Sequence, residues 1–147
     1  MHVQLAPFFG WAATLVVCGL AWTRGSPAER WGSVIVLIGS VASIPIQFLL
    51  PEPSQAVVSL LCEGLYGLSF LMLALRYASP WLGGAMLLQA IQFSLHAYYI
   101  VGDLPHDQTY RIVNNLNSAG VLICILFGIF ASWRRQVRTR DKVRAAR

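Results

Sequence analysis

Five long apolar stretches follow one another along the chain, separated by short polar or proline-containing segments. They run from about 5 to 22, 31 to 50, 55 to 76, 81 to 101 and 108 to 133. About 20 apolar residues in an α-helix span a hydrocarbon core of about 30 Å. The pattern therefore predicts an all-α fold, a polytopic transmembrane helical bundle of five spans. We expect one domain, 1–133, followed by a tail, 134–147.

The connecting segments carry the signals with which helices begin and end. Ser26, Pro27 and Glu29 form an N-cap, a favoured first-turn proline and a capping box ahead of the second stretch. The Pro-Glu-Pro segment at 51–53 cannot continue that helix. The next three helices are expected to begin after the N-caps Ser54, Ser79 and Asp107.

The distribution of charge predicts the orientation of the spans. Only 12% of the 147 residues are charged, against about 25% in soluble domains. Ten of the eleven basic residues fall in the segments of one predicted side, and Arg111 is the exception. Basic residues stay cytoplasmic, which predicts an outside N-terminus and a cytoplasmic C-terminus. The first stretch has no basic residue ahead of it and is expected to be a retained helix, not a cleaved signal peptide.

The tail is strongly basic and predicts an anchor at an anionic lipid surface, where each base contributes about 1 kcal/mol. Seven bases and one acid, Asp141, give it a net charge of +6. Its bases are Arg134, Arg135, Arg138, Arg140, Lys142, Arg144 and Arg147. No aromatic residue follows Trp133 to stack on bases, so no nucleic-acid partner is expected.

Tryptophans are expected near the membrane interfaces, where their amphipathic rings are favourable. Most of the following residues fall near a predicted interface: Trp11, Trp22, Trp31, Trp81, Trp133 and Tyr77.

A carboxyl group interrupts the third apolar stretch. With the predicted directions, Glu63 and polar residues of other spans fall in the same outer half of the membrane. The candidate polar cluster is Glu63, Gln92, His96, Arg111, Asn114 and Asn117, with Ser43 and Gln47 on the second span. Gln89, Gln92 and His96 share one helical face.

A carboxylate facing lipid costs about 2.5 to 3.5 kcal/mol, so Glu63 should face the bundle interior. Two interpretations remain open. The cluster is either a set of interhelical hydrogen bonds or a proton relay, ion pathway or polar ligand pocket.

A ridge of small residues follows the fifth stretch at spacings of four, namely Gly120, Cys124, Gly128 and Ser132. Without a hydrophobic driving force between helices in lipid, such ridges let backbones approach closely. The ridge is expected to pack within the chain, or against another copy or a partner.

Cofactor and metal chemistry find little support in the sequence. His96 has no second histidine within the spans, as a b-type haem normally requires. The loop around His106 lacks a metal-ligand spacing. Quinone contact by His96, Gln92 or Tyr99 has no spacing to support it. No catalytic motif is found, so we expect no cofactor, no metal and no enzymatic activity.

At S-P-A-E-R-W (26–31), at L-A-L-R…P-W (73–81) and at His96, the chain resembles small bacterial integral membrane proteins without an assigned activity. The resemblance implies a bacterial inner membrane and gives no residue a role. The expected function is association, as an accessory subunit of an inner-membrane complex or as an immunity-type partner. The alternative is a small oligomeric channel or transporter that uses Glu63, and a third possibility is quinone or haem contact.

Overall fold

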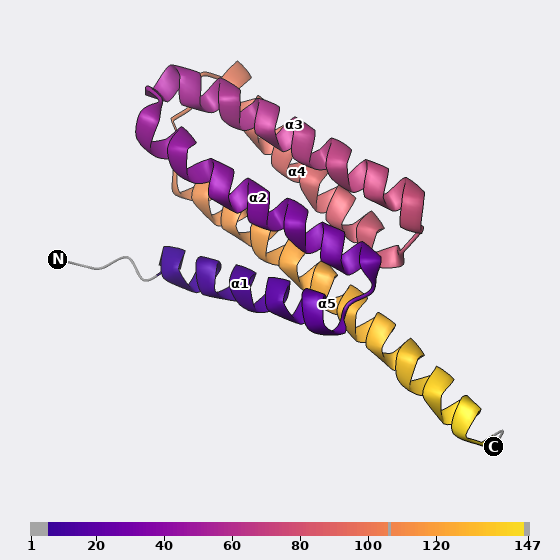
Figure 1. Ribbon diagram of the computed structural model, residues 1–147. Coiled ribbons are helices and arrows are strands. Elements are labelled where there is room, and N and C mark those ends of the chain that lie inside the picture. Colours follow the sequence, from indigo (N-terminus) through magenta and orange to yellow (C-terminus); the bar gives the residue numbers. More distant parts are fainter. Residues whose placement is uncertain (1–5, 106, 146–147) are drawn as a thin grey trace.

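Five helices make up residues 6–105 and 107–145, the part of the chain that the computed structural model describes (Figure 1). They are α1 (Ala6–Arg24), α2 (Pro27–Leu49), α3 (Glu52–Tyr77), α4 (Pro80–Val101) and α5 (Gln108–Ala145). The predicted all-α helical bundle is thereby confirmed. Arg147 of the predicted tail lies outside the described residues, as do His106 and the side chain of Gln47.

The helices are arranged in a closed ring in chain order. Each helix packs against its neighbours in sequence, and α1 also packs against α5. A further contact between α2 and α5 crosses the ring (Figure 1). The connections are short, which favours this packing of successive helices side by side. Helices α3 and α4 therefore lie on one side of the α2–α5 contact, and α1 lies on the other.

The helix ends follow the local signals, with one exception. The Glu29 carboxylate accepts a hydrogen bond of 2.7 Å from the Ser26 amide, so the predicted capping box is present. Asp107 caps α5 by accepting a bond of 2.8 Å from the Tyr110 amide. The prediction that Ser54 caps α3 is wrong, because α3 begins at Glu52 behind Pro51. Proline is tolerated in a first turn, where its missing N–H would have no helical partner.

Trp81 lies in the core of the bundle, in the first turn of α4. Only 7% of the residue is exposed. Its indole lies between two glycines: a Cβ would come within 2.6 Å of the ring at Gly32 and within 2.5 Å at Gly128. The ring also makes an edge contact with Phe70 at a centroid distance of 6.5 Å. Trp81 thus packs α4 against α2, α3 and α5 at once.

The small-residue ridge of α5 packs within the chain. A Cβ on Gly120 would meet the Leu88 side chain at 2.7 Å. Further along α5, the Cys124 sulfur lies 3.0 Å from the Cβ position of Gly84, also on α4. The last ridge residue, Ser132, hydrogen-bonds to Glu29 of α2. The ridge is therefore used for contacts with α4 and α2.

Three of the described helices are long and apolar enough to cross a membrane. The qualifying segments are Pro27–Ile46, Ser54–Tyr77 and Gln108–Lys142. The chain is thus a helical bundle with the composition of a membrane protein.

Replacing glycines by alanine tests the packing around Trp81. We expect Gly128→Ala to destabilise the bundle by about 1 to 3 kcal/mol, because the rigid indole occupies the new methyl position. A Cβ on Gly83 meets nothing within 4 Å. Gly83→Ala should therefore stabilise α4 by about 0.5 to 1 kcal/mol through helix propensity. Thermal unfolding in detergent, followed by circular dichroism, measures both; equal midpoints would contradict the described packing.

Candidate functional site

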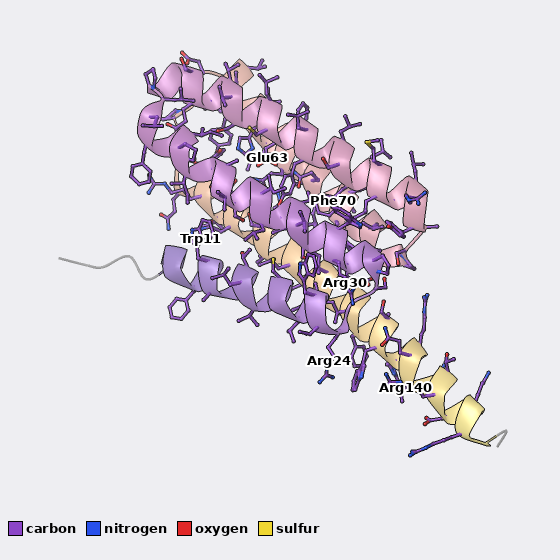
Figure 2. All side chains as sticks on the ribbon, viewed as in Figure 1. Trp11, Arg24, Arg30, Glu63, Phe70 and Arg140 are labelled. Atoms are coloured by element: carbon purple, nitrogen blue, oxygen red, sulfur yellow. The ribbon has the colours of Figure 1, made fainter. Side chains whose placement is uncertain are left out.

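Glu63 projects from α3 toward α4, in the half of the bundle that contains the α4–α5 loop (Figure 2). One of its carboxylate oxygens accepts a hydrogen bond from the amide nitrogen of Gln89, which is buried on α4. Other members of the predicted cluster were expected to bond to Glu63, but among the contacts described none of them does; they are Gln92, His96, Asn117 and Arg111. Gln89 lies on the same helical face as Gln92 and His96. The sequence therefore predicted this face of α4, but it did not predict that Gln89 is the residue that bonds to Glu63.

Gln92 joins α4 to α5 through both ends of its amide. Its nitrogen donates to the Asn114 side-chain oxygen. Its oxygen accepts a bond of 3.0 Å from the Asn117 amide. Gln92 and Asn117 are both buried. In lipid, such interhelical bonds each contribute about 0.6 to 2 kcal/mol, and here three side chains hold the two helices in register.

His96 is held at both ring nitrogens. Nδ1 lies 2.9 Å from the Gln92 carbonyl oxygen, which can only accept, so Nδ1 carries a hydrogen. Nε2 lies 2.9 Å from the Tyr110 hydroxyl. In the neutral ring Nε2 is then the acceptor, and Tyr110 donates to it. Sequence reasoning missed Tyr110, although it lies one helical turn before Asn114 on the same face of α5.

The α4–α5 loop closes this end of the bundle with a carboxylate. The Tyr99 hydroxyl donates a bond of 2.7 Å to Asp107, which also accepts from the Tyr110 amide. These bonds, the amide bond first, lower the pKa of Asp107 below its usual value. The Tyr110 ring lies 5.0 Å from that of Tyr99 and 5.4 Å from that of His96, measured between centroids.

Arg111 does not join the cluster, because its side chain is exposed. Residues 110, 114 and 117 face α4. Position 111 is rotated by about 100° around the helix axis from position 110, so its side chain points away from α4. Asn115 and Ser118 are exposed for the same reason. We use the name polar layer for the residues that the structure does bring together, which are Glu63, Gln89, Gln92, His96, Tyr110, Asn114 and Asn117.

A second carboxylate lies buried at the opposite end of the bundle. Glu29 is only 1% exposed. One oxygen accepts a bond of 2.9 Å from the Trp81 indole nitrogen. The other accepts from the Ser26 amide and, at 3.1 Å, from the Ser132 hydroxyl. The N-terminus of α2 adds a favourable dipole. Glu29 therefore links α2, α4 and α5, whereas its sequence context indicated a helix cap alone.

Two surface hollows lie apart from both carboxylates. The larger one, of about 470 Å³, follows the outer face of α4 along Phe93, Ala97 and Tyr98. The other, of about 270 Å³, lies beside Trp22 and Trp31 where α1 meets α2. Within the residues that the structure describes, no three His, Cys, Asp or Glu side chains group as a metal site would require.

Comparisons of the chain with protein-family models, with curated proteins and with solved structures give no match. The polar layer and the buried Glu29 are both polar sites in the interior of the bundle. Both place hydrogen-bonding side chains of three helices in contact, and they do so at the two ends of the bundle.

A double-mutant cycle measures the Glu29–Trp81 bond. Each single change, Glu29→Met and Trp81→Phe, should lower the free energy of unfolding by about 1.5 to 3 kcal/mol, because each removes one partner of this buried hydrogen bond. The double variant should lose less than the sum. Ser69→Ala serves as control, because its hydroxyl bonds only within its own helix. Additive losses in detergent unfolding would show that the two side chains do not interact.

Proposed function

We propose that the chain is a five-span protein of the bacterial inner membrane that acts by association, as an accessory subunit of a larger complex or as an immunity-type partner, and not as an enzyme. The observation that carries the proposal is the length of α5. This helix continues without a break to Ala145 and projects beyond the other four helices (Figure 1).

The projecting part of α5 presents its charges outward. A helix of 38 residues is about 57 Å long, whereas about 20 residues cross the hydrocarbon core. The bases beyond the bundle are exposed, at Arg134, Arg135, Arg138, Arg140, Lys142 and Arg144. Starting a helix is energetically unfavourable, but extending an existing one is not. Because the membrane-spanning part of α5 is already helical, the extension can continue that helix without packing against another part of the chain. It is thus available to anionic lipid head groups and to an acidic surface of a partner subunit.

The charges at the two ends of the bundle support five spans with a cytoplasmic C-terminus. Arg24, Arg30 and Arg140 lie at one end, and Glu63 lies in the other half (Figure 2). Asp103 and Asp107 occupy the α4–α5 loop at the end opposite the projecting helix. Basic residues are retained on the cytoplasmic side, so the basic end is the cytoplasmic one in this proposal.

Helices α1 and α4 complete the five spans in this proposal. With 19 residues, α1 is about 28 Å long, close to the thickness of the hydrocarbon core. Helix α4 carries Gln89, Gln92 and His96, and all three are buried against neighbouring helices. Lipid would meet the opposite face of α4, where Leu87 and Val101 are exposed.

The interior supports a structural use of most polar side chains. In the part of the chain that the structure describes, no buried side-chain nitrogen or oxygen lacks a hydrogen-bond partner. Gln92, Asn114 and Asn117 bond to one another and hold α4 against α5. The exposed faces and the α5 extension are then the surfaces on which association depends.

Single-cysteine labelling tests the topology. A cysteine at Thr139 should react with a membrane-impermeant maleimide only after the cytoplasmic side is opened, and a cysteine at Asp103 should react in intact spheroplasts. The background variant replaces Cys18, Cys62 and Cys124 by alanine. The reverse pattern, or the same sidedness at both positions, would contradict the five-span orientation.

Native mass spectrometry after mild-detergent extraction tests association. When the chain is expressed at its native level, we expect the spectra to show it bound to a second subunit. Neutralising the extension by Arg138→Gln, Arg140→Gln and Lys142→Gln should weaken that complex about tenfold or more, because its charge complementarity is lost. The control, Gln136→Ala with Thr139→Ala, changes the same helix without changing its charge. A lone monomer, or one that carries only anionic lipid, would contradict association with a protein partner.

A further inference from the structure

A hollow opens on the surface of the bundle where α1 passes into α2. It has a volume of about 270 Å³ and is lined by one residue of α1 and four of α2, namely Trp22, Pro27, Arg30, Trp31 and Val34. The four residues of α2 follow the spacing i, i+3, i+4 and i+7, so they share one face of that helix. Both indoles are 58% exposed. Two large aromatic rings and one arginine are therefore left uncovered here by the part of the chain that the structure describes.

The Arg30 guanidinium is the cation of this hollow, and its charge is not neutralised within the chain. The backbone of Arg30 is bonded, since its amide donates to the Ser26 carbonyl and its carbonyl accepts from the Ser33 hydroxyl. The guanidinium itself makes no hydrogen bond or ion pair within residues 6–105 and 107–145. The neighbouring carboxylate of Glu29 is buried, and both of its oxygens accept bonds from other groups.

The surroundings of Arg30 favour an anion. Arg24 adds a second positive charge at the same end of the bundle (Figure 2). The exposed carboxylates among the described side chains lie elsewhere, with Asp103 and Asp107 at the opposite end and Asp141 on the projecting part of α5. An arginine binds a phosphate group through two parallel hydrogen bonds that match its planar fork. A ligand with a phosphate is therefore the chemical complement of this position.

The hollow lies at the level where α5 leaves the bundle. Glu29, next to Arg30 in the chain, accepts a hydrogen bond of 3.1 Å from the Ser132 hydroxyl of α5. The Arg24 guanidinium lies over the Trp133 ring, 6.0 Å from its centroid. The run of bases on α5 begins at the residue after Trp133. The hollow is therefore level with the change of α5 from apolar to basic, which is where lipid head groups meet a membrane-spanning helix.

An apolar stripe continues from the hollow along α2. Beyond Val34, Ile38 and Val41 follow on the same face at spacings of four and three. Their side chains are 63% and 53% exposed. From Arg30 to Val41 the helix rises by about 16 Å, so a phosphate bound at Arg30 would place an acyl chain against this stripe. The order of cation, aromatic rings and aliphatic surface matches a phospholipid and not a soluble anion.

We propose that the hollow between α1 and α2 is a binding site for one anionic phospholipid, whose phosphate is bound by Arg30 and whose glycerol region lies against Trp22 and Trp31. Indoles are favourable there because each ring is apolar except for one N–H group. One acyl chain then follows the stripe from Val34 to Val41. The site rests on the membrane placement proposed above, but it does not require a protein partner. It also differs from anchoring by the α5 extension, because it holds a single lipid at a fixed position.

Native mass spectrometry of the complete chain in mild detergent, titrated with single lipids, tests the site. The first phosphatidylglycerol should bind about tenfold or more tightly than phosphatidylcholine with the same acyl chains, because only the former has a net negative head group. Arg30→Gln should weaken binding of phosphatidylglycerol about tenfold or more. The matched control is Arg76→Gln, which removes the same charge from an exposed arginine outside the hollow.

Four results would overturn this site. They are equal affinities for the two lipids, an unchanged affinity in Arg30→Gln, an equal loss in Arg76→Gln, and displacement of the lipid by millimolar inorganic phosphate. A dimer of the chain that forms in place of the lipid adduct would likewise show that the hollow has a different occupant.

Quenching of tryptophan fluorescence locates the lipid without any change at Arg30. Phosphatidylglycerol with brominated acyl chains is added at one lipid per chain. The double variant Trp22→Phe, Trp31→Phe should lose most of the quenching, because the two indoles of the hollow are removed. Trp11→Phe is the control, since Trp11 lies near the other end of α1, and it should retain the quenching (Figure 2). Undiminished quenching in the double variant would overturn the proposed site.

The lipid site and the proposed association can fail separately. A chain that binds this lipid but no second subunit supports the site and contradicts association with a protein partner. A complex with a second subunit that shows no preference for the anionic lipid supports association and overturns the site.

Discussion

The hydrogen bond between the Trp81 indole and the Glu29 carboxylate holds the basic end of the bundle together. Trp81 fits between helices only because Gly32 and Gly128 leave room for its ring. Glu29 can remain buried because it accepts bonds from Trp81, Ser132 and the Ser26 amide. Removing a partner from a buried charge costs more than the bond itself contributes, so these residues depend on one another. The packing of α2, α4 and α5 follows from this mutual dependence.

The opposite half of the bundle is held together differently. There the amides of Gln92, Asn114 and Asn117 bridge α4 and α5 without a charge. His96 lies beside these amides and contacts the backbone carbonyl of Gln92, whereas Glu63 bonds to Gln89.

Much of the fold follows from sequence, because helix length, capping and short connections act locally. The apolar stretches predicted the five helices, and Ser26 with Glu29 predicted the start of α2. The polar layer was predicted in outline, since helical phase places Gln89, Gln92 and His96 on one face. The individual bonds depend on rotamers and on the rotation of facing helices, which a linear pattern does not contain.

For the same reason the sequence did not predict that Trp81 lies in the core, or that Glu29 bonds to other helices besides capping α2. These contacts depend on the approach of Gly32 and Gly128 to the indole and of Ser132 to the carboxylate. The continuous α5 has a mechanical consequence: its last twelve residues act as a rigid lever of about 18 Å beyond Trp133. A change of about 10° in the tilt of the membrane-embedded part, well within the range that such helices adopt, would displace the tip by about 3 Å relative to the membrane surface.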